Sequence, residues 1–77
     1  METYYWKRYL RASLGALTGT VTDTLKISAI SKMEAENMMT RYFTHGVAPM
    51  QWDKHFATLE DESGKVITTW HDVRSYA

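Results

Sequence analysis

Four side chains near the start of the chain have the types and spacing of a binding surface. In the stretch YYWKRYLR, one alternate set consists of Tyr5, Lys7, Tyr9 and Arg11. A two-residue spacing brings side chains onto one face of a β-strand. Aromatic rings on such a face can stack on the bases of single-stranded nucleic acid, while Lys and Arg contact phosphates. The same residue types also form the centres of protein interfaces.

The charge of the whole chain argues against the nucleic-acid interpretation. Nine Lys and Arg residues balance nine Asp and Glu residues, so the formal net charge is zero. Nucleic-acid-binding domains usually carry a basic surplus, because their affinity depends on neutralising phosphates. The chain also lacks an RNP-type glycine-aromatic motif. We therefore favour contact with a protein, followed by a purely structural amphipathic strand, and place nucleic acid third.

Other candidate sites for chemistry are weaker. His55 and His71 are expected opposite each other in a C-terminal hairpin, with Asp53 and Asp72 close in sequence. Two histidines and a carboxylate can hold a metal, but no spacing such as H-E-x-x-H is present, so we expect no metal and no cofactor. The acidic run 60–62 falls at a turn, where exposure to solvent makes carboxyl groups unsuited to acid–base catalysis. No G-x-S-x-G motif is present, and we expect no enzymatic activity.

Two strands are predicted in the N-terminal half of the chain. The first covers 3–12 and alternates an apolar set with the aromatic and basic set. A connection with two glycines, residues 13–19, is predicted to form a hairpin turn. The second strand covers 20–30. Its expected apolar face consists of Val21, Leu25, Ile27 and Ala29.

A helix is predicted to begin at Lys32. Ser31 and Glu34 form the S-x-x-E pattern of a capping box, in which the serine hydroxyl accepts from the Glu34 amide and the glutamate carboxylate accepts from the Ser31 amide. Gly46, with Pro49 soon after it, is expected to end the helix. Between these ends, apolar residues at helical spacing predict one buried stripe: Ala35, Met38, Met39, Tyr42 and Phe43.

A second hairpin is predicted near the C-terminal end of the sequence. Its strands, 55–60 and 65–73, flank a turn at 61–64 whose Gly64 supplies a left-handed conformation. If Asp61 faces Lys65, the register places Leu59 opposite Ile67 and His55 opposite His71. On the other face, the same register places Phe56 opposite Trp70.

The order ββαββ predicts a single α+β domain over residues 1–77, a four-stranded, mainly antiparallel sheet with one helix packed on one face. The opposite face must then meet water or a partner. We expect Tyr4, Trp6 and Leu10 to face the helix. The expected partner-binding set on the other side is Tyr5, Lys7, Tyr9, Arg11, Phe56 and Trp70.

The length of the chain makes a partner useful for stability. A chain of 77 residues without cysteine has no disulfide to support it, and domains of this size bury only about 60% of their unfolded surface. A partner protein or a second copy, in a homodimer, can supply the missing contacts. The sequence has no apolar run of transmembrane length and no basic-then-apolar leader, so we expect a cytoplasmic protein without a membrane partner.

The segment KISAISKMEAENMMTRYF resembles the strand, cap and helix unit of many small phage and mobile-element proteins. The likeness is one of size and layout, without a diagnostic motif, so it transfers no functional residue. Proteins of this kind include anti-CRISPR proteins and phage inhibitors of host RNA polymerase. The resemblance implies a non-enzymatic inhibitor that sterically blocks a host protein or nucleoprotein complex. Because an acidic excess is missing, a DNA mimic is not expected.

Overall fold

The computed structural model describes residues 1–44 and 51–72 of the chain. The predicted helix end at Gly46 and Pro49 and the predicted strand end at Val73 lie outside these residues. The elements are β1 (Glu2–Arg11), β2 (Gly19–Ala29), α1 (Lys32–Thr44), β3 (His55–Asp61) and β4 (Val66–Trp70).

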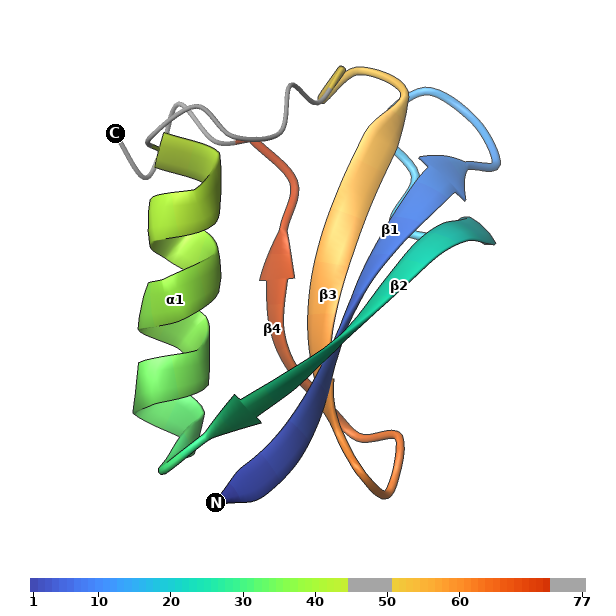
Figure 1. The fold of residues 1–77 in the computed structure, drawn as a ribbon. Helices are drawn as coiled ribbons and strands as arrows, with labels where there is room; N and C mark the ends of the chain where they lie inside the picture. Colours follow the sequence, from blue (N-terminus) through green and yellow to red (C-terminus); the bar gives the residue numbers. More distant parts are fainter. Residues whose placement is uncertain (45–50, 73–77) are drawn as a thin grey trace.

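The strands form one antiparallel four-stranded sheet in the order β2-β1-β3-β4, and α1 lies along one side of it (Figure 1). This confirms the predicted α+β fold. No helix among the described residues has the length and apolar character needed to cross a bilayer. The buried core between α1 and the sheet consists of Tyr4, Trp6, Ile27, Ala29, Ala35, Met39, Ala57, Leu59 and Trp70.

The predicted capping box begins α1. The backbone amide of Glu34 donates to Ser31 Oγ over 3.2 Å, as predicted. The Glu34 carboxylate accepts from the Ile30 amide over 3.4 Å and not, as predicted, from the Ser31 amide. The buried stripe is narrower than predicted. Ala35 and Met39 are buried, whereas Met38 is 43% exposed, so its predicted place in the core is wrong.

The β3–β4 hairpin contains a one-residue bulge that changes which face Trp70 occupies. Glu60 lies opposite Val66 as predicted, but Leu59 lies opposite Thr68, which leaves Ile67 as the extra residue. One extra residue moves every later side chain to the other face of the strand. Trp70 therefore lies opposite Ala57 and is only 1% exposed in the core. Its predicted position on the partner-binding face is wrong.

A second bulge lies between β1 and β2. Arg8 is opposite Asp23 and Tyr9 is opposite Val21, so Thr22 is the extra residue. Val21 consequently shares a face with Tyr9 and not with Leu25. The predicted apolar face of this strand was wrong at Val21 for that reason.

The helix covers only one end of the β1–β2 ribbon. In β2, Ile27 and Ala29 are buried, but every residue from Gly19 to Lys26 is exposed. In β1, Tyr4 and Trp6 are buried as predicted, while Leu10 is exposed. The far end of the β1–β2 ribbon extends beyond the helix (Figure 1), which explains why the expected burial of Leu10 does not occur.

The burial of Trp70 leads to a stability prediction. Trp70→Ala should lower the free energy of unfolding by about 3–5 kcal/mol, because it leaves a large cavity under α1. Val66→Ala, on the opposite face of the same strand, should cost less than about 1 kcal/mol. Urea unfolding followed by tryptophan fluorescence and circular dichroism measures both. Equal losses for the two variants would contradict the observed register.

Candidate binding face

The side of the sheet away from α1 is the candidate binding surface, and we call it the open face. Its residues follow from the strand registers, because residues directly opposite each other share a face. It includes the four N-terminal residues singled out in the sequence. Its members are Tyr5, Lys7, Tyr9 and Arg11 of β1, Val21, Thr24 and Lys26 of β2, Phe56, Thr58 and Glu60 of β3, and Val66 and Thr69 of β4.

The carboxylate of Glu60 organises the middle of the open face. Lys7 Nζ donates to Oε1 over 3.1 Å, and Tyr9 Oη and Thr58 Oγ1 each donate to Oε2 over 3.1 Å. Burial alone would raise the pKa of Glu60, but these hydrogen bonds and the charge of Lys7 outweigh it and lower the pKa. Glu60 is thus a buried ionic anchor, and its interpretation as part of a solvated turn was wrong.

An aromatic stack lies beside this anchor. The rings of Tyr9 and Phe56 are parallel within 2° with centroids 4.7 Å apart, since the two residues are directly opposite across β1 and β3. The guanidinium carbon of Arg11 lies 5.7 Å from the centroid of the Phe56 ring. Phe56 is only 3% exposed as a result. Its predicted exposure on the open face is wrong, because β1 side chains cover it.

Arg11 is held by backbone carbonyls from three separate segments. Nη1 donates to Ala16 O over 2.6 Å, Nε and Nη2 donate to Trp52 O over 3.2 and 3.0 Å, and Nη2 also donates to His71 O over 3.1 Å. These contacts join the β1–β2 connection, the segment before β3 and the end of β4. We call this arrangement the Arg11 clip.

A shallow apolar hollow of about 340 Å³ opens on this face between the β1–β2 connection and β4. Leu17 and Val66 are both about half exposed at its sides, and the Tyr9–Phe56 stack lines it. Sequence reasoning missed the hollow, because its walls come together only once β1 lies beside β3. The lining residues are Tyr9, Leu17, Thr18, Gly19, Phe56, Thr58, Val66 and Thr69.

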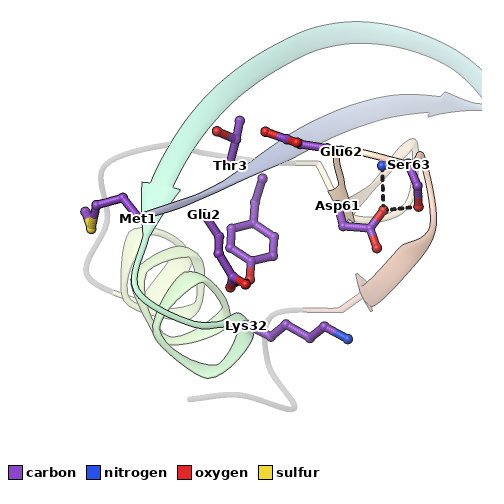
Figure 2. A pocket seen from close by; sticks show the side chains of 8 residues that line it. Met1, Glu2, Thr3, Lys32, Asp61, Glu62 and Ser63 are labelled. Carbon is purple, nitrogen blue, oxygen red and sulfur yellow. Dashed lines mark hydrogen bonds between the residues drawn. The ribbon is translucent and has the colours of Figure 1, made fainter.

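A second hollow, of about 400 Å³, lies at the start of β1 (Figure 2). Its carboxylates serve local structure. Asp61 Oδ1 accepts from the amide and hydroxyl of Ser63 over 2.9 and 2.6 Å, which lowers the pKa of Asp61 and holds the turn. The hydroxyl of Tyr4 donates to Glu2 over 2.5 Å, and this bond is the main reason that the pKa of Tyr4 rises to about 12.

The predicted pairing of two histidines does not form. The β3–β4 register among the described residues ends at Ala57 opposite Trp70, and His55 lies opposite Leu10 of β1. The bulge at Ile67 causes the difference. In the described part of the chain, no group of three or more His, Asp or Glu side chains could hold a metal.

The chain matches no protein-family model, no curated protein and no solved structure. Function must therefore be inferred from the open face itself. Its Lys7 and Arg11 cations are engaged within the molecule, as are the Glu60 carboxylate and the Phe56 ring. Tyr5 and Tyr9 remain partly exposed, beside the exposed residues of β2. The surface that this arrangement offers to another molecule is apolar and aromatic, with polar groups at its margins.

The Glu60 anchor predicts a dependence of stability on pH. Because folding lowers the pKa of Glu60, its contribution is complete above the ordinary value of 4.5 and is lost as the pH falls through the lowered value. Glu60→Gln should cost about 1–3 kcal/mol near neutral pH and reduce the loss of stability in acid. Urea unfolding across this pH range measures both effects. Glu62→Gln, at an exposed position in the turn, is the control, and an acid profile for Glu60→Gln that matches wild type would contradict the assignment.

Proposed function

We propose that this chain is a non-enzymatic protein-binding domain that contacts its partner through the open face. The observation that carries the proposal is the apolar hollow flanked by Leu17 and Val66. Protein interfaces have their strongest contacts where an apolar or aromatic side chain of one partner fills a pocket of the other. A hollow of about 340 Å³ is large enough to receive such a side chain, and the stacked Tyr9 and Phe56 rings give it a rigid floor.

The state of the three β1 cations supports a protein partner over single-stranded nucleic acid. Lys7 is bonded to Glu60, Arg8 is paired with Asp23, and Arg11 donates to three carbonyls. Phosphate contacts need cations whose donors are available, and the affinity of nucleic-acid binders depends on them. Of the four residues first selected for stacking and phosphate binding, the two cations are thus committed to internal contacts.

Within this role, we place the chain among inhibitors that act by steric blocking, of the anti-defence or host-takeover type encoded by phages. The support is the resemblance in size and layout to such proteins, together with a surface suited to docking. The expected partner is a host protein or nucleoprotein complex in the host cytoplasm. A rigid, small domain bound at a functional surface can block access without any chemistry of its own.

Loss of the apolar sides of the hollow should abolish capture of the partner. We expect Leu17→Ser combined with Val66→Thr to weaken capture from a lysate of the natural host by about tenfold or more, because interface energy concentrates in such pockets. The measurement is affinity capture on immobilised protein followed by mass spectrometry. The matched control is Leu14→Ser combined with Met38→Ser, which changes two exposed apolar residues elsewhere. Equal capture by both folded variants would contradict the proposal.

The nucleic-acid alternative makes a different prediction. If the open face bound single-stranded nucleic acid, affinity would fall steeply with salt concentration, with a slope set by the number of phosphates neutralised. We expect no measurable binding of fluorescent single-stranded DNA or RNA even at low salt, measured by anisotropy. Binding with a steep salt dependence that is lost in Arg11→Gln would favour the alternative and overturn the protein-binding proposal.

A further inference from the structure

The outer edge of β2 is an open site for another strand. Within residues 1–44 and 51–72, β2 is an edge strand that pairs with β1 alone, and it is exposed from Gly19 to Lys26. The edge of such a strand presents backbone N–H and C=O groups that have no partner in the sheet. A second extended strand can form backbone hydrogen bonds with these N–H and C=O groups. A segment that binds this edge must therefore have an extended backbone, whatever its side chains are.

The bulge and the helix limit which part of this edge can pair regularly. Thr22 is the bulged residue, and a bulge disrupts the ladder locally because the strand bends and twists more strongly there. Toward the other end, Ala29 is buried and α1 begins at Lys32. The regular, accessible segment is thus Asp23–Ile27, and its central residue is Leu25.

We propose that this edge pairs with the same edge of a second copy of the chain, antiparallel and about a two-fold axis at Leu25. In this register Leu25 lies opposite the partner's Leu25. Thr24 lies opposite the partner's Lys26, and Asp23 lies opposite the partner's Ile27. All opposed residues share a face of the sheet, as an antiparallel ladder requires. The proposal concerns a surface other than the open-face hollow and does not depend on the proposed function.

The charges of the segment favour this register over its neighbours. An axis at Asp23 or at Lys26 would place two like charges directly opposite each other, which destabilises a ladder. An axis at Thr24 would place Lys26 opposite the bulged residue Thr22, where the regular ladder ends. With the axis at Leu25, Lys26 meets a threonine hydroxyl. Asp23 is already neutralised, because Arg8 Nε donates to its carboxylate over 2.7 Å and pairs with it.

The burial of Leu25 gives the pairing an apolar component. Leu25 lies on the side of the sheet that α1 covers elsewhere, but it is 45% exposed because the helix reaches only Ile27 and Ala29. Directly opposed side chains have Cβ atoms about 4.5–5.5 Å apart, so the two leucines would cover each other. Pairing would also join two sheets into one continuous sheet with both helices on the same side, and the two open faces would become adjacent.

Sedimentation velocity over a range from low to high micromolar concentration tests the proposal. We expect the wild-type chain to change from monomer to dimer as the concentration rises. Leu25→Lys should raise the dissociation constant by about tenfold or more, because it places two like charges opposite each other and removes the apolar pair. Leu14→Lys, at a residue 88% exposed in the β1–β2 connection, should leave dimerisation unchanged. A wild-type chain that stays monomeric throughout, as it would if the edge accepted only a foreign strand, overturns the proposal.

Cross-linking identifies the interface independently. The natural chain has no cysteine, so a single introduced thiol reports one contact. Leu25→Cys should form a disulfide-linked dimer rapidly under mild oxidation, because the two Cβ atoms fall near disulfide distance. Ser28→Cys, on the same strand but away from the axis, should react slowly. Equal rates for the two variants, or a dimer that Leu25→Lys does not weaken, would place the interface elsewhere and overturn the proposal. Partner capture through Leu17 and Val66 is a separate measurement that neither result decides.

Discussion

The alternation of side chains along a strand is the constraint on which this small structure depends. Each residue of β1 and β3 has one face of the sheet available to it, and α1 covers only part of one side. The two bulges, at Thr22 and at Ile67, decide which side chains join the core. The bulge at Ile67 turns Trp70 under the helix, where it supplies a large apolar contact. The bulge at Thr22 turns Val21 to the open face, whereas Asp23 stays opposite Arg8 and pairs with it.

These two bulges also mark the limit of what the sequence predicts. Periodicity and the capping box located the strands and the helix, because those signals are local. A bulge has no such signal here, since Thr22 and Ile67 are ordinary strand residues. The predicted register therefore put the side chains beyond each bulge on the wrong face of the sheet, and Val21 and Trp70 were misplaced for this reason. The sequence did not reveal the role of Glu60 for a related reason. Its hydrogen-bond donors Lys7 and Tyr9 are distant in sequence, and only the pairing of β1 with β3 brings them close to its carboxylate.

The Lys7 and Arg11 side chains on the open face hold its strands and connections together. A chain of 77 residues without disulfides has few ways to fix its connections, and the side chains of Lys7 and Arg11 both serve this purpose. Lys7 joins β1 to β3 through Glu60. The Arg11 clip joins segments whose carbonyl groups would otherwise need water. Side chains that looked suited to an external ligand in the sequence thus hold the sheet together, and the apolar hollow and Tyr5 are left for recognition.

The place of β1 in the sheet has a consequence for the order of assembly during synthesis. β1 precedes the other described strands in the chain, but it lies inside the sheet and needs β3, whose residue Glu60 pairs with Tyr5. The β1–β2 hairpin and α1 can form from local contacts, since hairpins and helices form fastest. Until β3 has left the ribosome, the edge of β1 that β3 will occupy is open. That β1 edge is therefore exposed to aggregation until β3 has emerged and paired with it, whereas the outer edge of β2 stays open in the finished sheet.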